Sequence, residues 1–516
     1  METELKLLVA PADLPRVLRL PLVKLAQSGP VRRTTLRALY FDTPGHALAG
    51  MGMVLRVRRE SGRWIQAVKG DDPAGGALSR RIEIEWQVPG PVPDLALVRD
   101  SELGALLRGA RAGKWKRELV CVFETRFRRA TAELSLPGGA SAQLCVDSGS
   151  ILAAGSSLPV SEVEIELRDG DPAVLLDFAS ALRAELPFRM GVQSKAERGH
   201  ALFGAHPDAP ARAEAVALRR RQGMDPALVA LLAGCARQFH LNEQGAREGA
   251  DPEYLHQARV ALRRLRVALA LRRDAAWRER VAPLQSELRW LSAELGELRD
   301  LEVLSADVVA PLAALRPAAP GLRSARGRLS RAIGLSRARA RAALDSPRCT
   351  LVMLDLARLL AGPLPAAGDA PGATTDVQAS SAALLERRWK KLRQLGGEDV
   401  LALPAERLHA LRIVAKKLRY AAGFFASLHP GGRHDRFAAA LARLQDQLGT
   451  INDCVVAARL VRERLAAPAG ARADVREAAG LACAGMDGWI AARQHAARAK
   501  LDSAWHALLH AKPHWR

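Results

Sequence analysis

Aromatic residues are scarce in this 516-residue chain, making up 4% of it, with only three Tyr. Proteins that bind single-stranded nucleic acid commonly stack the bases on aromatic side chains, so this scarcity argues against that class of partner. A nucleic-acid binder would rest on net charge alone, and it is the weakest of the alternatives that we keep.

Cysteines are few and scattered, at positions 121, 145, 235, 349, 454 and 483, and none forms a C-x-x-C pair. This spacing suggests neither a zinc site nor a redox motif. No apolar run reaches the roughly 18 residues of a membrane span. The acidic N-terminus lacks the basic and apolar regions of a signal peptide. We therefore expect a reducing cytoplasm and no membrane partner.

Positive charge is in excess, because 77 Lys and Arg stand against 55 Asp and Glu and give a formal net charge of +22. A charge of this size favours polyanionic partners. With 49% hydrophobic and 26% charged residues, the composition is that of a globular protein. The length predicts about two to four domains.

The two halves of the sequence have different periods. Up to about residue 200, short strand patterns alternate with Gly/Pro turns, whereas from about 226 onward the pattern is helical and rich in Ala, Leu and Arg. A linker is expected at 205–225, and the Pro/Gly-rich stretch 362–375 divides the helical half. The expected strands cover 2–9, 36–42, 53–59, 63–69, 80–88, 120–128, 143–147 and 161–168, with helices at 12–25, 99–111 and 172–186.

Charged residues alternate with apolar ones along five of the expected strands. The opening "METELKL" places Glu2, Glu4 and Lys6 on one face, since strand side chains have a period of two. A closed barrel with a polar lumen would account for this pattern and bring the charged rows around one cavity. Such a lumen suits a polyphosphate with a hard divalent metal. The other rows are Arg56 and Arg58; Arg81, Glu83 and Glu85; Arg126 and Arg128; and Glu162, Glu164 and Glu166.

These motifs carry a family resemblance. E-x-E-x-K at the N-terminus, "YFDTPGHALAGMGMVLRVRR", "WIQAVKG", "RIEIE", "VEIEL" and "SKAERG" together resemble the CYTH domain, or triphosphate tunnel metalloenzyme family, over residues 1–204. The resemblance implies an eight-stranded antiparallel tunnel that hydrolyses a triphosphate with Mg²⁺ or Mn²⁺. It implies metal carboxylates at Glu2, Glu4, Glu164 and Glu166, with Glu162 as a further candidate. It implies phosphate contacts from Lys6, Arg56, Arg58, Lys69, Arg81, Arg126 and Lys195.

No protein nucleophile is needed for that chemistry. Two metal ions can neutralise the terminal phosphates, and one of them can activate a water for in-line attack. The sequence contains no G-x-x-x-x-G-K-[ST] motif, which excludes the usual P-loop.

The helical half contains two copies of one helical segment, "YLHQARVALRRLRVAL" and "RLHALRIVAKKLRYAA", at an offset of 153 residues. The same offset relates "LGELRDLEV" to "LGTINDCVV", so the half is an internal duplication. In each helix, the His and the cations three, seven and ten residues after it lie within about 80° of one another around the helix axis, and so on one face. These residues are His256, Arg259, Arg263, Arg264 and Arg266 in the first copy, and His409, Arg412, Lys416, Lys417 and Arg419 in the second.

This pattern resembles the CHAD domain, the conserved-histidine α-helical domain, over residues 226–516. The resemblance implies two pseudo-repeated four-helix bundles, about 226–361 and 376–516, whose basic helices line a groove for inorganic polyphosphate. Two departures are mild: Lys416 and Lys417 replace Arg, and Asn452 stands where the first copy has Arg299.

The sequence therefore predicts an α+β protein with an N-terminal barrel, flanking helices and a C-terminal all-α domain. It resembles bacterial CYTH–CHAD inorganic triphosphatases, hydrolases that convert tripolyphosphate to diphosphate and phosphate, and we expect long-chain polyphosphate to bind the helical domain. Association with polyphosphate granules is a further expectation. The alternatives are a non-catalytic polyphosphate scaffold, a hydrolase of an organic triphosphate such as thiamine triphosphate or a nucleotide, and a nucleotide cyclase.

Overall fold

The computed structural model divides the chain into two compact units. Unit 1 comprises Met1–Ala211 and Asp345–Leu364, and unit 2 comprises Arg212–Leu344 and Pro365–Arg516. The structure describes residues 2–60, 62–70, 78–99, 119–204, 209–249, 251–365 and 376–516. Segment 345–364 therefore belongs to unit 1, although the sequence pattern places most of it in the first helical repeat.

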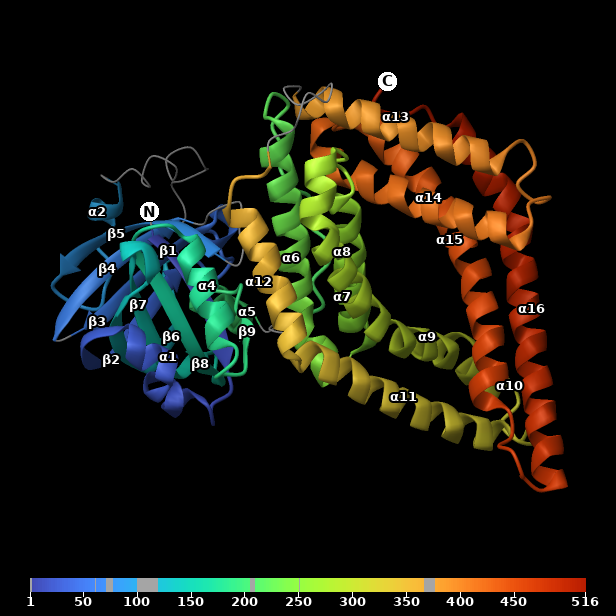
Figure 1. The fold of residues 1–516 in the computed structure, drawn as a ribbon, viewed down its shortest axis with the longest axis horizontal. Helices are drawn as coiled ribbons and strands as arrows, with labels where there is room; N and C mark the ends of the chain where they lie inside the picture. The colour runs from blue at the N-terminus through green and yellow to red at the C-terminus, as the bar shows by residue number, and fades with distance from the viewer. Residues whose placement is uncertain are drawn as a thin grey trace. The chain divides into compact units, whose positions relative to one another are not determined.

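Unit 1 is built on an antiparallel sheet, in which nine strands lie within the described residues where the sequence predicted eight. Their order is β5-β4-β3-β2-β6-β7-β8-β1-β9, with an additional pairing between β5 and β1 (Figure 1). The ninth strand is the three-residue β9, which adds to β1. The strands are β1 (Glu2–Val9), β2 (Gln27–Asp42), β3 (Met53–Glu60), β4 (Arg63–Gly70), β5 (Leu78–Val88), β6 (Val120–Ser135), β7 (Ser141–Ala153), β8 (Ser156–Asp169) and β9 (Phe188–Met190).

Alternation along the strands separates a packed face from a charged one. In β1, Leu5 and Leu7 are fully buried between the charged positions, and Val163 and Ile165 do the same in β8. The approach of β7 to β6 requires a glycine: a Cβ at Gly149 would lie 2.1 Å from the carbonyl oxygen of the neighbouring strand. The period-two pattern of the sequence thus sets which side chains can meet inside the sheet.

Short helices cover parts of this sheet. They are η1 (Leu14–Arg19), α1 (Pro21–Ala26), η2 (Ala49–Met51), α2 (Leu95–Arg99), η4 (Pro137–Gly139), α4 (Ala173–Leu182) and α5 (Lys195–Phe203). The helix α5 begins with a capping box, because Ser194 and Glu197 each accept the backbone amide of the other. This cap fixes Lys195 as the first residue of the helix.

Unit 1 also contains helix α12 (Pro347–Ala361), which packs against α4 and β9 (Figure 1). Ser346 caps its first turn and Pro347 occupies the first helical position, where a missing amide has no consequence. The hydroxyl of Thr350 donates to the carbonyl of Phe188 at 3.2 Å. In the second copy of the duplication, Ala499 stands where Ser346 does, and the helix there continues without a break.

Unit 2 is helical throughout its described residues, apart from short connections. Its α-helices are α6 (Met224–Glu248), α7 (Pro252–Leu269), α8 (Ala275–Glu294), α9 (Gly296–Leu304), α10 (Ala310–Leu315), α11 (Leu322–Asp345), α13 (Val377–Gly396), α14 (Ala405–Phe424), α15 (Gly432–Leu460) and α16 (Ala473–His510). A 3₁₀ turn, η6 (Ala426–Leu428), and two π-helical turns, η5 (Ser305–Val309) and η7 (Val461–Leu465), connect some of them. The 153-residue offset extends beyond the quoted motifs, since α6 begins at residue 224 and α13 at residue 377.

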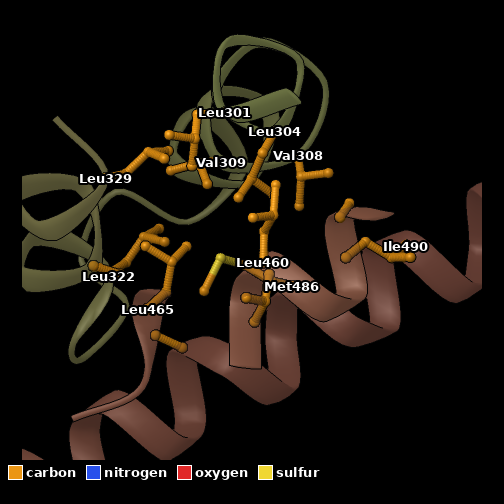
Figure 2. Packing of buried hydrophobic residues seen from close by; sticks show 14 of the residues in the cluster. Leu301, Leu304, Val308, Val309, Leu322, Leu329, Leu460, Leu465, Met486 and Ile490 are labelled. Carbon is orange, nitrogen blue, oxygen red and sulfur yellow. The ribbon is translucent and has the colours of Figure 1, made fainter. Parts of the chain in front are cut away.

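An apolar core joins the two copies of the duplication inside unit 2. Figure 2 shows Leu301, Leu304 and Val308 facing Leu460, Met486 and Ile490. These residues come from α9 and η5 in the first copy and from α15 and α16 in the second, and all are nearly fully buried. Burial of apolar area holds the copies together as one folded unit.

An antiparallel sheet followed by an all-helical part agrees with the α+β organisation that the sequence predicts. Among the helices that the structure describes, none is both long and apolar enough to cross a membrane.

Candidate phosphate and metal site

A cavity of about 750 Å³ lies on the charged face of the sheet in unit 1. Each contributing strand presents alternate residues to it, as Glu4 and Lys6 do from β1. Among the described residues, two aromatic side chains, Tyr40 and Phe127, reach the lining. Its basic residues are Lys6, Arg32, Arg56, Arg58, Lys69, Arg129, Arg168 and Lys195, and its acidic residues are Glu4, Glu60, Glu83, Glu85, Glu164 and Glu166.

One ion network is centred on Lys195. Its Nζ lies 3.0 Å from Glu164 Oε1 and 2.7 Å from Asp147 Oδ2, and it also pairs with Glu162. Arg129 bonds Asp147 and Glu164 at 2.6 Å each. Burial alone would raise the pKa of the Glu164 carboxyl, but Lys195, Lys6 and Arg129 hold it well below its usual range. The Glu164 carboxyl is therefore ionised at neutral pH.

A second network occupies β3, β4 and β5. Glu83 accepts from Arg56 at 2.7 Å and from Lys69 at 2.6 Å. Although burial opposes it, these two cations lower the pKa of Glu83 to about 2. Burial and the neighbouring Glu83 raise the pKa of Glu85, against the effect of Arg58 at 3.1 Å. Two carboxyls of one strand thus have pKa values moved in opposite directions.

Glu4 and Glu166 form the third feature of the cavity. They are directly opposite one another in the β1–β8 register, and both line the cavity. Glu166 pairs with Arg168 at 2.5 Å, whereas Glu4 has no ion pair within the part of the chain that the structure describes. Like charges directly opposite in an antiparallel pair are destabilising. A divalent cation shared by the two carboxylates would remove that repulsion, so the residues fit the metal that the CYTH resemblance implies.

Most of the predicted tunnel residues reach the cavity. Lys6, Arg56, Arg58, Lys69, Lys195, Glu4, Glu164 and Glu166 line it. Glu162 lies behind the lining, fully buried against Lys195 and Arg198. Glu2 and Arg81 belong to β1 and β5, but their side chains lie outside the described residues.

Arg126 is a correction to the predicted set. Its side chain is 59% exposed and pairs with Glu124 rather than lining the cavity. The inward face of β6 carries Thr125, Phe127 and Arg129 instead. Both faces of this strand carry arginine, so the alternation alone did not identify the inner face.

Sequence reasoning also missed four charged residues of the two networks. Glu83 and Glu85 were visible as an alternating row but were given no role, and Arg129 and Asp147 were not singled out. Arg129 and Asp147 could have been found from the β6–β7 register, which places them opposite each other. An acidic residue on the neighbouring strand marks the inward arginine, but that requires the register to be known.

In unit 2, the two copies of the His–cation helix, α7 and α14, pack against each other. The Nε of Arg263 donates to the hydroxyl of Tyr420 at 3.3 Å. Burial and nearby cations lower the pKa of Arg259 to about 10 and that of Lys416 to about 7. Burial also lowers the pKa of Arg412, and Arg263 adds to the effect. We call Arg259, Arg263, Arg412 and Lys416 the cation cluster.

Few carboxylates oppose the cation cluster. Asp453 lies 3.7 Å from Arg412, and burial raises the pKa of Asp300, which Arg259 partly offsets. Two predicted histidines flank the cluster: burial and Arg299 lower the pKa of His256, and His409 contacts Asn452 at 3.0 Å.

Four other predicted cations are not part of this cluster as defined, although Arg419 contributes to the lowered pKa of Lys416. Arg264 lies over the ring of Phe424, 4.8 Å from its centroid. Burial lowers the pKa of Lys417, and Arg266 contributes as one of several neighbouring cations. Arg419 is exposed. The helix pattern therefore mixes residues of the cluster with residues that pack elsewhere.

Comparison with known proteins decides the family. Residues 1–200 match the CYTH domain family, and residues 230–462 match the CHAD domain family. The chain carries a CYTH domain followed by a CHAD domain. Both resemblances inferred from the sequence are thus confirmed.

Several known proteins are similar to parts of this chain. An inorganic triphosphatase of Haemophilus influenzae is 30% identical over 165 residues, 32% of this chain and 44% of the relative. The chain thus matches less than half the length of that curated relative. The CHAD domain of the plant Ricinus communis is 31% identical, with a TM-score of 0.48, covering 59% of this chain and 98% of that one. HpAC1 from Hippeastrum, described as having a dominant triphosphatase activity, is 20% identical with a TM-score of 0.31, covering 41% and 98%.

Proposed function

We propose that this protein is a metal-dependent inorganic triphosphatase whose CHAD domain binds long-chain polyphosphate. The observation that carries the proposal is the cavity of the CYTH domain, where cations from several strands surround the opposed Glu4 and Glu166. A pure anion-binding scaffold gains nothing from two carboxylates placed against each other. The similarity to an inorganic triphosphatase supports the same reaction.

The additional β5–β1 pairing supports a tunnel. With it, strands β1 to β8 would form a closed ring around the cavity, and β9 would remain outside. Closure lets cations from opposite sides reach one elongated anion and leaves no unpaired edge among the eight strands.

Within this tunnel, Glu4 and Glu166 would hold Mg²⁺ or Mn²⁺. The bound metal would supply positive charge at the transferring phosphate and lower the pKa of a water. Arg56, Lys69 and Arg58 would bind one end of the triphosphate, and Lys6, Lys195 and Arg129 the other. Their present carboxylate partners keep these cations charged and in place before the substrate arrives, which is electrostatic preorganisation.

Glu85 is suited to proton exchange. Its raised pKa contrasts with the depressed pKa of Glu83 on the same strand. Two carboxyls whose environments move their pKa values apart commonly divide acid and base roles. Glu85 would take up the proton released by the attacking water, while Glu83 stays ionised and positions Arg56 and Lys69.

The lining favours an inorganic substrate over an organic triphosphate. Tyr40 and Phe127 are its aromatic residues within the described chain, and both are nearly fully buried. A base or a thiazolium ring would find little surface to stack on. Thiamine triphosphate and nucleotides remain the alternative substrates.

The cation cluster supports polyphosphate binding by the CHAD domain. Burial and the repulsion of neighbouring cations lower the pKa values of Arg259, Arg412 and Lys416, so the free protein holds these charges at an energetic disadvantage. A flexible polyanion would relieve that repulsion, and its binding would restore the ordinary pKa values.

Phosphate release from tripolyphosphate, ATP and long-chain polyphosphate, with and without Mg²⁺ or Mn²⁺, tests the proposal. We expect tripolyphosphate to be cleaved at least about tenfold more efficiently than ATP, or about 1.4 kcal/mol in transition-state stabilisation. Equal specificity constants would instead favour a nucleotide substrate. Binding of tripolyphosphate without turnover under any metal would favour the scaffold.

A further inference from the structure

A second cluster of potential metal ligands lies in unit 1 outside the cavity lining. Asp42, His46 and His200 each place one ligand atom within 4.8 Å of the others. Asp42 is the last residue of β2, His46 lies in the loop that follows, and His200 is on α5. The cluster therefore joins a strand, a loop and a helix that are distant in sequence.

The carboxylate of Asp42 is fixed in place. Its side chain is fully buried, and its Oδ1 accepts the amides of Thr43 at 2.7 Å and Leu48 at 2.8 Å. Its Oδ2 accepts the amide of Ala49 at 2.9 Å and lies 3.9 Å from Nδ1 of His200. Of the two oxygens, Oδ2 thus carries fewer backbone contacts and faces the imidazole.

The two imidazoles meet at the same kind of nitrogen. Nδ1 of His46 lies 3.1 Å from Nδ1 of His200. His46 adopts a φ of 57°, a left-handed conformation that is strained for a residue with a side chain, and its amide donates to the carbonyl of Thr43 at 2.9 Å. The strained loop holds one imidazole against the other, and each imidazole also makes a T-shaped contact with a phenylalanine ring, His46 with Phe203 and His200 with Phe123.

The spacing and the donor types suit zinc. In a tetrahedral site with Zn–N distances of about 2.0–2.1 Å, ligand atoms lie about 3.3 Å apart. Two separations of the cluster, 3.1 Å between the imidazoles and 3.9 Å between His200 and Asp42, bracket that value, and all three ligand atoms lie within 4.8 Å of one another. Two imidazoles with one carboxylate form a common zinc set with one position left for water. Mg²⁺ prefers oxygen ligands only, so the donors differ in kind from Glu4 and Glu166.

We propose that Asp42, His46 and His200 form a binding site for a zinc-class divalent cation, separate from the cation site of the tunnel. The metal takes the place of the proton between the two Nδ1 atoms. It ties loop 43–49 to α5, the helix whose first residue, Lys195, contacts the cavity carboxylates.

The test uses the full chain without a histidine tag, titrated with Co²⁺ in excess Mg²⁺ and followed by the visible absorption of tetrahedral Co²⁺. We expect one equivalent to bind and Zn²⁺ to displace it. Affinity should fall at least tenfold in His46→Asn, since Asn tolerates the left-handed backbone, and in His200→Gln. The matched controls are Glu4→Gln, in the cavity of unit 1, and His434→Gln, whose imidazole lies 3.3 Å from that of His514 in unit 2. Both should bind Co²⁺ normally.

The proposal is overturned if the wild-type protein shows no such absorption, if the absorption survives both histidine variants, or if either control abolishes it. A second measurement on the unsubstituted protein is independent of how the variants fold. Zn²⁺, but not Mg²⁺, should protect His46 and His200 from carbethoxylation, as mapped by peptide mass. Equal modification of both residues with and without Zn²⁺ would also overturn the site.

Discussion

At the scale of single residues, the charged side chains around the cavity of unit 1 differ in how completely neighbouring charges compensate them. Glu164 is surrounded by three cations, and Glu83 by two. Glu4 instead faces the carboxylate of Glu166. The same amino acid is therefore surrounded by cations at one place and set against a like charge at another, and variants can test whether the two places have different roles.

Glu4→Gln should abolish Mg²⁺-dependent hydrolysis, lowering turnover by about a hundredfold or more, because metal charge stabilisation is worth several kcal/mol. The metal-free protein should be equally or slightly more stable, by about 0.2–1 kcal/mol, since the cross-strand repulsion is gone. Turnover and thermal unfolding measure the two effects. Glu124→Gln, on the outer face of β6, is the control, and full turnover by the Glu4 variant at saturating Mg²⁺ would remove Glu4 from the site.

Arg129→Lys and Arg126→Lys form a matched pair on one strand. Arg129 makes two-pronged contacts with Asp147 and a further one with Glu164, a geometry that a lysine cannot reproduce. We expect kcat/KM for tripolyphosphate to fall at least about tenfold in the first variant, or about 1.4 kcal/mol. The second variant should retain wild-type kinetics. A larger loss in Arg126→Lys would restore the original assignment.

Lys416 should make polyphosphate binding depend on pH. Burial and neighbouring arginines lower its pKa from 10.5 to about 7, so folding becomes less favourable as pH falls from 10.5 through 7. A bound polyanion stabilises the protonated form, and affinity should therefore rise as pH falls from 8 to 6. Lys416→Arg, which stays charged, should flatten this dependence in a binding titration. An unchanged pH profile in that variant would exclude Lys416 as its source.

At the scale of elements, helix α12 joins the sheet of unit 1 although helices of unit 2 precede and follow it in sequence. Its apolar residues Val352, Met353 and Leu356 are nearly fully buried, and Arg358 pairs with Asp177 of α4 at 2.7 Å. Buried apolar side chains of this size contribute about 1.5–3 kcal/mol each, so α12 is a structural part of the CYTH domain as folded here.

A fragment of residues 1–211 should therefore unfold at a lower temperature than the same fragment fused through a Gly/Ser linker to residues 345–364. Thermal unfolding of the two fragments is the measurement. The matched control carries Val352→Asp and Leu356→Asp in the fused segment, which should cancel the gain because unpaired charges cannot be buried there. Identical unfolding temperatures for all three fragments would show that α12 contributes nothing to the stability of the sheet.

At the scale of the whole molecule, the net charge of +22 is compatible with binding any polyanion, so charge alone cannot assign the ligand. The helical domain could bind polyanions either through a generic basic surface or through a defined cluster of cations, and these two cases predict different ligands. Arg259, Arg263, Arg412 and Lys416 are held by two packed helices and are half-buried, a placement that a rigid duplex reaches less readily than a thin chain.

The full-length Glu4→Gln protein should bind long-chain polyphosphate without cleaving it, with an affinity that falls steeply as salt rises, because binding releases counterions. Combining Arg263→Ala and Arg412→Ala should weaken binding strongly, while Arg264→Ala, whose side chain packs on Phe424, should weaken it less. Double-stranded DNA should compete poorly at about 0.15 M salt. Equal affinity for DNA and polyphosphate would identify the helical domain as a generic basic surface.

The sequence by itself determined the features that depend on period and spacing. Alternation placed Glu4, Lys6, Arg56 and Arg58 on the inward face, and the structure has all of them in the cavity lining. The 153-residue offset revealed the duplication, because repeated spacing is visible without coordinates. Both features follow from local geometry, in which the fold of a segment repeats the pattern of its residues.

Only the tertiary structure decided questions of pairing between distant segments. The sequence pattern selected Arg126 and passed over Arg129, whereas the register places Arg129 opposite Asp147. Nothing local to α12 showed that it packs on β9, and no sequence pattern indicated that His46 meets His200, which is 154 positions further along the chain. These contacts are decided by which faces bury together, a free-energy balance over the whole domain that no single stretch of sequence contains.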